Sequence, residues 1–309
     1  MTEEALYIKP KTIKQALESA DSGPKFKFIS GGTDVVANQF HGYDKATLII
    51  DVSAIEEMNT VEKRNGYLKI GSLVKLNALI HHKDIKNNFP TLIEAANSVG
   101  SPLIRATATL GGNILCENRC LYYNQSEWWR DSIGNCLKCD GDVCIATGGK
   151  KACFSELVSD TCPSLISMGA IVEIQDKQGV IQIKLEDLYT GDGVQPRNLP
   201  EKALLISIML PLKKGFEVVF RKLRQRRSLE FTSLTSSVSK DNEGNITIAL
   251  AGVDPGPVIV RGHVKDDLEP LLDKAVKKSR AIDNDMMTRK YRKQMIRTYL
   301  TESFKILEL

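Results

Sequence analysis

All seven cysteines of this 309-residue chain lie in one stretch, between Cys116 and Cys162. Thiolates gathered by a loop either cross-link to one another or bind a soft metal centre, and the redox compartment usually decides which. The N-terminus has two acidic residues, Glu3 and Glu4, where a secretory signal would have a basic start and then an apolar core. We therefore expect a cytoplasmic protein whose cysteines hold metal.

The composition excludes several classes of protein. Apolar residues make up 42% of the chain and the formal net charge is +4, which is too mild to indicate a nucleic-acid partner. No apolar run approaches the roughly 20 residues that a membrane-spanning helix needs, and the run at 47–52 has the length of a strand. We expect two or three domains with ordinary cores, and neither nucleic acid nor membrane as a partner.

The first part of the chain is typical of a small α/β unit. Apolar spacing predicts a helix over 12–20 and strands over 26–29 and 47–52. These elements define an expected first unit, residues 1–54. A second unit, residues 55–213, follows it.

The second unit is expected to contain a long insertion. A strand at 67–72 and paired strands around Lys177-Gln178-Gly179 mark its body. Residues 116–156, here called the cysteine segment, are rich in Asn, Gly, Asp, Trp and Tyr and show no clear periodicity. We interpret the cysteine segment as a loop inserted into this unit.

Residues 214–309 look like a separate domain of the α+β class, which is also the class expected for the whole chain. The expected elements are strands at 217–223, 233–239 and 246–253 and helices from about 264 and from about 284 to the end.

Two Gly-Gly turns stand about 80 residues apart, at Ser30-Gly31-Gly32-Thr33-Asp34 and at Thr109-Leu110-Gly111-Gly112-Asn113. Glycine permits positive φ and close backbone approach, so each turn offers several N–H donors to one phosphate. Neither fits the dinucleotide fingerprint of a Rossmann fold, because its three glycines and distal acid are missing. Each could also be an ordinary turn.

Together with Ser101-Pro102-Leu103-Ile104-Arg105, these turns resemble the FAD-binding subunit of the molybdenum hydroxylases, the xanthine dehydrogenase family. The resemblance spans the chain and includes Ile70-Gly71-Ser72 and Ala251-Gly252-Val253. It implies a two-subdomain FAD-binding region of the PCMH type, similar to vanillyl-alcohol oxidase. A C-terminal α+β domain with a three-stranded antiparallel sheet and helices would follow.

The resemblance also implies which residues contact FAD. Asp160 and Lys222 would lie nearer the ribityl and isoalloxazine end, where a cation stabilises the anionic reduced ring. From the residues alone, Asp160 would be an ordinary loop acid and Lys222 part of a solvated basic run. The implied contacts are Ile29, Ser30, Gly31, Gly32, Thr33, Asp34, Ser101, Thr109, Gly111, Gly112, Asn113, Asp160 and Lys222.

The cysteine segment departs from most flavin subunits of this family and is similar to one relative, the β subunit of 4-hydroxybenzoyl-CoA reductase. There the inserted loop binds a [4Fe-4S] cluster, in which four widely spaced thiolates bind one iron each. We expect Trp128 and Trp129, the two tryptophans of the chain, to pack the loop against the body and shield the cluster from water. The implied ligands are Cys120, Cys136, Cys144 and Cys153.

Other readings of the cysteines stay open. Cys136-Leu137-Lys138-Cys139 has a zinc-like spacing, although a matching partner pair is missing. Disulfides are a further alternative, and Cys139 could replace Cys136 as a ligand. In our interpretation Cys116, Cys139 and Cys162 are non-ligand thiols.

The resemblance implies an electron-transfer subunit without catalytic residues of its own. Electrons from ferredoxin would pass through the [4Fe-4S] cluster and FAD toward a molybdenum-pterin large subunit, in a complex with a [2Fe-2S] small subunit. That complex would remove the phenolic hydroxyl of 4-hydroxybenzoyl-CoA or a similar aromatic thioester. Two alternatives are the FAD subunit of a xanthine or aldehyde dehydrogenase-type hydroxylase that reduces NAD or a quinone, and a non-enzymatic module braced by zinc or a cluster.

Overall fold

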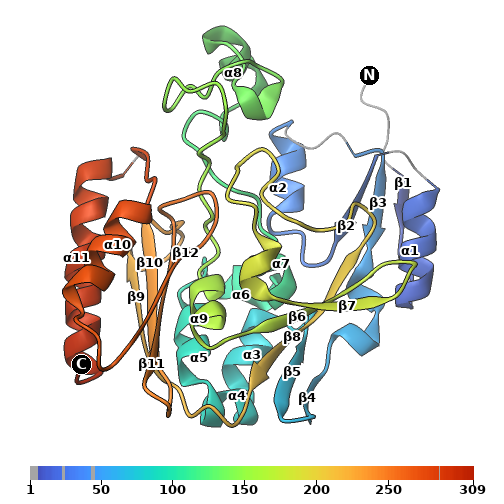
Figure 1. Ribbon diagram of the computed structural model, residues 1–309. Helices are drawn as coiled ribbons and strands as arrows, with labels where there is room; N and C mark the ends of the chain where they lie inside the picture. The colour runs from blue at the N-terminus through green and yellow to red at the C-terminus, as the bar shows by residue number, and fades with distance from the viewer. Residues whose placement is uncertain (1–5, 23–24, 43–45, 285) are drawn as a thin grey trace.

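The computed structural model describes residues 6–22, 25–42, 46–284 and 286–309. The acidic start at Glu3 and Glu4 lies outside the described residues. Three β-sheets, each with its own helices and apolar core, follow one another along the chain (Figure 1). The α+β class expected from the sequence is confirmed.

The first sheet is parallel and has three strands in the order β1-β3-β2. Helix α1 begins after Thr12, whose side chain accepts a hydrogen bond from the Gln15 backbone N–H, as expected of a helix N-cap. Its buried residues recur at helical spacing and pack on this sheet, and Leu204 and Ile206 from β8 complete the same core. The elements are β1 (Leu6–Ile8), α1 (Ile13–Asp21), β2 (Phe26–Ile29), α2 (Val35–Phe40), β3 (Leu48–Asp51), η1 (Val52–Ala54) and η2 (Glu56–Met58).

The second sheet is antiparallel and has five strands in the order β4-β5-β8-β6-β7. A group of short helices covers one side of this sheet in Figure 1, and the largest apolar core lies between these helices and the sheet. Its strands are β4 (Val61–Arg64), β5 (Tyr67–Gly71), β6 (Ile171–Gln175), β7 (Val180–Lys184) and β8 (Leu204–Pro211). The helices are α3 (Leu76–His81), α4 (Lys83–Asn88), α5 (Pro90–Asn97), α6 (Pro102–Thr107), α7 (Leu110–Ile114), α9 (Thr161–Ser167) and η4 (Leu185–Leu188).

The third sheet is antiparallel and has four strands, not the expected three. The strand missed from the sequence is β12, which pairs with β11 at the edge of the sheet and buries Val258 and Val260. The run is short and follows the turn-like Asp254-Pro255-Gly256-Pro257, so its strand character depends mostly on pairing. The elements are β9 (Glu217–Leu223), β10 (Leu234–Lys240), β11 (Asn245–Ala251), β12 (Val258–His263), α10 (Glu269–Lys278) and α11 (Arg289–Ile306).

The cysteine segment projects from the body at one end of the molecule (Figure 1). At its base Arg119 and Glu156 pair as an isolated antiparallel bridge, with N···O distances of 2.9 and 2.7 Å. Contrary to the expected irregular loop, it contains a two-turn helix, which Ser126 caps by accepting a hydrogen bond from the Trp129 N–H. The side chain of Trp128 is 76% exposed, so the expected packing role is wrong for this tryptophan. The elements are α8 (Glu127–Ile133) and η3 (Leu137–Cys139).

Among the described residues, the helices are too short or too polar for any of them to cross a membrane.

Candidate functional site

The two glycine turns meet where the first sheet adjoins the second. A Cβ atom on Gly31 would overlap the carbonyl oxygen of Thr107, and one on Gly111 would come within 2.6 Å of the Ser72 Cβ atom. Gly32 has φ of +71°, in the left-handed region that favours glycine. Gly31 is therefore required where the first turn approaches the chain that leads into the second, and Gly111 is required where the second turn approaches Ser72.

Helix α7 holds the second turn in place. Its N-cap, Thr109, accepts a hydrogen bond from the Gly112 N–H at 3.1 Å. The Asn113 side-chain oxygen accepts hydrogen bonds from the Ser159 hydroxyl at 2.9 Å and from both the hydroxyl and the N–H of Thr161, at 2.7 and 3.2 Å. Because these bonds fix the amide, its NH₂ group, which has no hydrogen-bond partner among the described residues, is available to a ligand.

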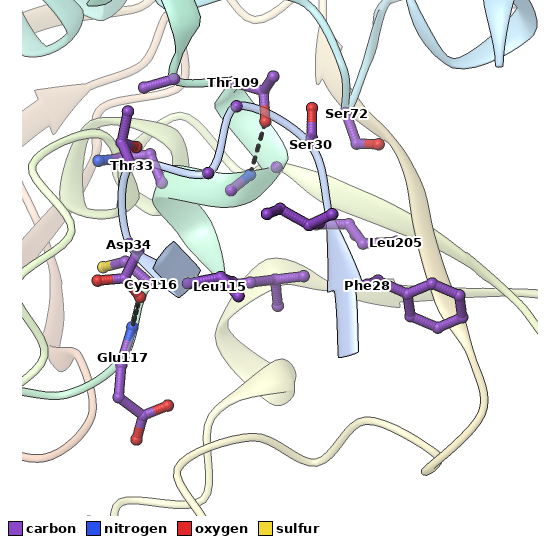
Figure 2. Close-up of a pocket in the computed structure, with 18 of the residues that line it drawn as sticks. Phe28, Ser30, Thr33, Asp34, Ser72, Thr109, Leu115, Cys116, Glu117 and Leu205 are labelled. Atoms are coloured by element: carbon purple, nitrogen blue, oxygen red, sulfur yellow. Dashed lines mark hydrogen bonds between the residues drawn. The ribbon is translucent and has the colours of Figure 1, made fainter. Parts of the chain in front are cut away.

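A cavity of about 640 Å³ runs beside both turns. In Figure 2, Ser30 and Thr109 lie along one edge of it, Phe28 and Leu205 on one side, and Cys116 with Glu117 on the other. The residues predicted as FAD contacts that line it are Ile29, Ser30, Gly31, Gly32, Thr33, Asp34, Thr109, Gly111, Gly112, Asn113 and Asp160.

Two residues predicted as FAD contacts do not line this cavity. Ser101 instead caps helix α6 by accepting a hydrogen bond from the Ile104 N–H at 3.4 Å. Lys222 is buried behind Asp160 and donates to the Asp160 carboxylate at 2.6 Å, to the Ser98 carbonyl at 3.0 Å and to the Glu230 carbonyl at 3.2 Å. An ammonium has three donors, so these acceptors saturate Lys222.

Asp160 and Lys222 therefore form a buried ion pair. Burial raises the pKa of Asp160, and the charge of Lys222 opposes this rise. Thr235 supplies a further hydrogen bond to the same carboxylate at 3.0 Å. The side chains at this end of the cavity thus form a nearly neutral Asp160–Lys222 pair, whereas the resemblance implies an isolated cation at Lys222.

Ser72 is a further site residue that is not among the contacts predicted from the sequence, although it belongs to the motif Ile70-Gly71-Ser72. It lines the cavity, is 3% exposed, and its Oγ has no hydrogen-bond partner among the described residues. A buried hydroxyl without a partner is costly. Together with the Asn113 amide and the turn N–H groups, it gives the cavity donors suited to a dinucleotide, so the residues present fit FAD.

The first residues of the cysteine segment, 116–120, begin at the cavity wall and lead away from it. Asp34 accepts a hydrogen bond from the Glu117 N–H at 2.9 Å and forms an ion pair with Arg119. Arg119 also donates to Asn38 on α2 at 3.2 Å and lies 4.7 Å from the ring centroid of Phe231. The next residue is Cys120, so the first predicted ligand directly follows the cavity wall.

Three of the four predicted cysteine ligands, Cys120, Cys144 and Cys153, are close enough for their charges to affect one another. Burial raises the pKa of Cys120 to about 11, and the charges of Cys153 and Cys144 add to the rise. The fourth, Cys136, adjoins Cys139 instead, whose pKa burial raises to about 11. No three Cys, His, Asp or Glu side chains in the described part of the chain converge as ligands of a single metal ion.

Of the other two thiols, Cys162 is buried and Cys116 is partly exposed. Burial raises the pKa of both Cys116 and Cys162 to about 12. Cys116 lines the flavin-sized cavity, whereas Cys162 belongs to the core around α9. Both thiols are therefore protonated near neutral pH.

Comparison with known proteins identifies the class. Residues 2–213 match the family model of the FAD-binding domain in molybdopterin dehydrogenase, so the chain belongs to that family. The matched region contains both glycine turns, the cavity-lining residues up to Leu205 and the cysteine segment.

Two curated relatives extend the similarity along the chain. It is 28% identical over 261 residues to the aldehyde oxidoreductase FAD-binding subunit of Escherichia coli, covering 81% of this chain and 82% of that protein. It is 24% identical over 251 residues to the nicotinate dehydrogenase FAD-subunit of Eubacterium barkeri, covering 79% and 71%.

Solved structures share the fold. The chain superposes on carbon monoxide dehydrogenase from Hydrogenophaga pseudoflava with a TM-score of 0.78 at 17% identity, covering 99% of this chain and 97% of that one. For quinoline 2-oxidoreductase from Pseudomonas putida the TM-score is 0.74 at 13% identity, covering 98% and 96%.

Proposed function

We propose that the chain is the electron-transfer subunit of a molybdenum-containing reductase that dehydroxylates 4-hydroxybenzoyl-CoA or a similar aromatic thioester. Ferredoxin is the proposed electron donor, and a molybdenum-pterin large subunit with a [2Fe-2S] small subunit completes the complex. FAD and a [4Fe-4S] cluster are the proposed cofactors. Catalytic residues for the substrate would lie on the large subunit.

The observation that carries this proposal is the position of the cysteine segment. Glu117 and Arg119 line the FAD cavity, and Cys120, the next residue, is the first of the four proposed cluster ligands. Soft thiolates suit an iron–sulfur cluster. A single chain with both sites brings a one-electron carrier close to a two-electron carrier.

Bound FAD supplies the exchange between two-electron and one-electron transfer. The chain's own residues bind and orient it. The turn N–H groups, the Ser72 hydroxyl and the Asn113 amide are the proposed donors to the cofactor. Asp34 is engaged by Arg119 and the Glu117 N–H, which offsets its negative charge beside an anionic dinucleotide.

The proposed cluster ligands are Cys120, Cys136, Cys144 and Cys153. A cubane is wider than a single ion, so its ligands stand farther apart than those of zinc. The assignment of Cys136 rather than Cys139 is the part that most needs a test, because the two thiols adjoin.

Anaerobic reconstitution of the full chain with ferrous iron and sulfide tests the cluster. We expect about four irons and four sulfides per chain, as for a [4Fe-4S] centre, and an EPR signal after dithionite reduction. Cys136→Ser should lose the cluster and Cys139→Ser, the matched control, should keep it. A wild-type chain without a reducible paramagnetic centre would overturn the cluster, and the reverse result for the two variants would move the ligand to Cys139.

A second candidate function is that of a hydroxylase subunit that passes electrons outward to NAD or a quinone. It is favoured by the relatives named above, which are FAD subunits of an aldehyde oxidoreductase and a nicotinate dehydrogenase. Anaerobic assays of the co-purified complex distinguish the two. Oxidation of reduced ferredoxin by 4-hydroxybenzoyl-CoA supports the first, and reduction of NAD by an aldehyde or an N-heterocycle supports the second.

A further inference from the structure

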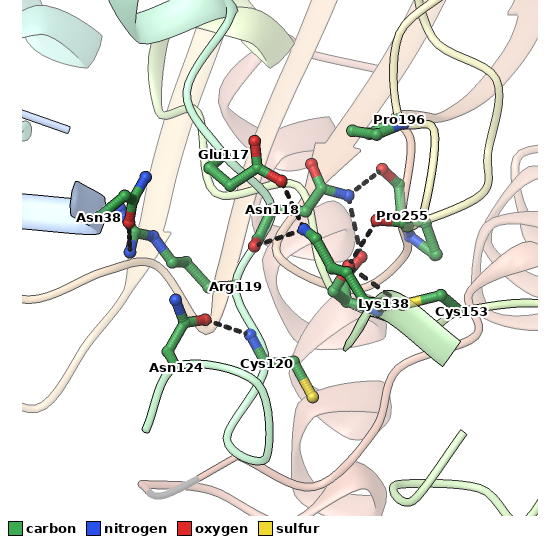
Figure 3. Close-up of polar contacts among 12 residues, drawn as sticks. Asn38, Glu117, Asn118, Arg119, Cys120, Asn124, Lys138, Cys153, Pro196 and Pro255 are labelled. Carbon is green, nitrogen blue, oxygen red and sulfur yellow. Dashed lines mark hydrogen bonds and ion pairs between the residues drawn. The ribbon is translucent and has the colours of Figure 1, made fainter. Parts of the chain in front are cut away.

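An ion pair joins the wall of the FAD cavity to the cysteine segment. Glu117 lines the cavity, and Lys138 lies in η3, between Cys136 and Cys139. The Lys138 Nζ atom is 2.5 Å from the Glu117 Oε1 atom (Figure 3). The two residues are far apart in sequence, so the pair is a tertiary contact that fixes the segment's orientation.

Lys138 is held from several sides. Its side chain is 6% exposed, which is rare for a lysine and requires charge pairing. The ammonium donates to the Asn118 carbonyl at 3.4 Å and lies 4.6 Å from the ring centroid of the buried Tyr123. An attraction between a cation and an aromatic face strengthens when both are desolvated. The positive charge therefore has a fixed location.

The chain around Glu117, the partner of Lys138, is also held in place. The Asn118 side chain is fully buried and donates to the Ser155 carbonyl at 2.9 Å and to the Pro255 carbonyl at 2.8 Å. These bonds tie the entry of the cysteine segment to its exit and to the third sheet. Lys138 thus contacts a part of the chain that buried hydrogen bonds of Asn118 hold in place.

The positive charge of Lys138 also acts on the Cys153 thiol. Burial raises the pKa of Cys153, and the charge of Lys138 acts against that rise. Figure 3 shows Lys138 together with Glu117, Cys153 and Cys120. The charges of Cys153 and Cys144 in turn contribute to the raised pKa of Cys120. The Lys138 ammonium therefore contacts the cavity wall through Glu117, and Lys138 lies in the part of the cysteine segment that also contains Cys120 and Cys153 (Figure 3).

We propose that Lys138 is a positioning residue that anchors the cysteine segment to the FAD cavity through Glu117 and sets a fixed positive charge between the two redox sites. The proposal rests on the proposed function in assigning a redox centre to the thiols, whereas FAD binding follows from the family. Reduction adds negative charge, so a nearby cation raises a reduction potential and a nearby carboxylate lowers it. Partial burial makes this effect larger than it would be in water.

A charge cycle on the full chain tests the proposal. The variants are Lys138→Met, Glu117→Gln and the double variant, and the readouts are the midpoint potentials of the flavin and of the reconstituted centre. We expect a downward shift for Lys138→Met, an upward shift for Glu117→Gln and a return toward the wild-type values in the double variant. Lys150→Met removes the same charge from an exposed site of the same segment and should shift neither potential measurably.

A purely structural role gives a different pattern. Both single variants would then move the potentials in the same direction, and that result, or an effect of Lys138→Met no larger than that of Lys150→Met, would overturn the proposal. Lys138→Arg keeps the charge and should restore the potentials if the segment folds. Limited proteolysis should cut within residues 116–156 faster in Lys138→Met than in Lys138→Arg.

The result of this charge cycle can be distinguished from a failure of the cluster proposal. Iron and sulfide analysis of the same samples reports whether a cluster is present. The flavin potential and the proteolysis rate do not require one, because Glu117 lines the FAD cavity. If no iron binds, the opposed shifts in flavin potential still support the anchor, and their absence overturns it.

Discussion

At the scale of single residues, unsatisfied hydrogen-bonding groups point most directly to the ligand. Within the described ranges, three buried serines have hydroxyls without a hydrogen-bond partner: Ser72, Ser164 and Ser236. Ser72 lines the FAD cavity beside Gly111, whereas Ser164 lies in α9, inside the core. Ser72 and Ser164 are chemically alike and differ in access to the cavity.

Ser72→Ala should weaken FAD binding by about 2- to 10-fold, the equivalent of one neutral hydrogen bond of 0.5–1.5 kcal/mol. The apo chain should be as stable as wild type or slightly more stable, because the hydroxyl has no protein partner to lose. Ser164→Ala is the matched control and should leave FAD affinity unchanged. Fluorescence titration with FAD and urea denaturation of the apo chain measure both quantities, and equal FAD affinity in wild type and Ser72→Ala would remove this residue from the site.

Sequence reasoning finds some site residues and not others for identifiable reasons. The glycine turns are recognisable because glycine itself signals the backbone requirement. Ser72 is not, because its role depends on Gly111 packing against it. The saturation of Lys222 is also invisible in the sequence, because two of its acceptors are carbonyl oxygens, of Ser98 and Glu230, which any residue type would supply.

At the scale of elements, strands with clear boundaries were predicted well. The expected strands 26–29 and 217–223 coincide with β2 and β9, since turn residues bound their apolar or β-branched runs. The prediction failed for α8 and β12. Helix α8 has no apolar stripe, because Trp128 faces solvent and Arg130 is buried, and β12 depends on pairing with β11.

A polar cluster across the second sheet shows what pairing adds. Glu173 lies at a register irregularity of β6 and binds one side chain from each of three other strands of the sheet. Its carboxylate pairs with Lys69 on β5 at 2.6 Å and accepts from Ser207 on β8 at 2.5 Å and from Gln182 on β7 at 3.0 Å. The hairpin around residues 177–179 was predictable, but this cluster requires the strand order β5-β8-β6-β7.

Glu173→Gln should reduce the free energy of unfolding by about 1–2 kcal/mol at neutral pH, because a charged group in several hydrogen bonds is lost. Burial raises the pKa of Glu173, but Lys69 and the hydrogen bonds outweigh it and leave the pKa below its usual value. A lowered pKa contributes stability above the unfolded-state value and loses it as the pH falls through the folded-state value.

Urea denaturation from about pH 7 down to about pH 3.5 spans this titration. The acid-side loss of stability should be smaller in Glu173→Gln than in wild type. Glu18→Gln, which removes an exposed carboxylate paired with Lys14 at 3.9 Å, is the control and should have almost no effect. Parallel acid limbs in wild type and Glu173→Gln would contradict the role of this cluster.

At the scale of the whole molecule, one buried arginine joins the C-terminal helix to the base of the cysteine segment. Arg292 on α11 is fully buried. Its guanidinium donates to the Ser233 carbonyl at 2.9 Å and to the carbonyls of Ile282 and Gly252, and pairs with Glu156 at 2.8 Å. Since Glu156 also forms the backbone bridge with Arg119, this cluster connects the third sheet to the cavity wall.

Arg292→Met should destabilise the chain by about 3–5 kcal/mol, because it leaves a buried carboxylate without its counter-ion and several carbonyls without partners. Arg297→Met on the same helix removes exposed ion pairs with Glu269 and Asp273 and should cost at most about 1 kcal/mol. Burial already raises the pKa of Glu156 to about 7 while Arg292 opposes the rise, so its removal raises that pKa further. A raised pKa stabilises the fold at low pH and loses this contribution as the pH rises through the folded-state value.

The stability of Arg292→Met should therefore fall more steeply than that of wild type between about pH 5 and pH 8. The double variant Glu156→Gln/Arg292→Met removes the titrating group and should flatten this slope, although the unpaired carbonyls keep it less stable than wild type. Urea denaturation at several pH values measures both effects. An Arg292→Met slope flatter than that of wild type would show that Glu156 is solvated in the variant and that the base of the cysteine segment opens when its link to α11 is lost, whereas a slope equal to that of wild type would contradict the effect of Arg292 on the pKa of Glu156.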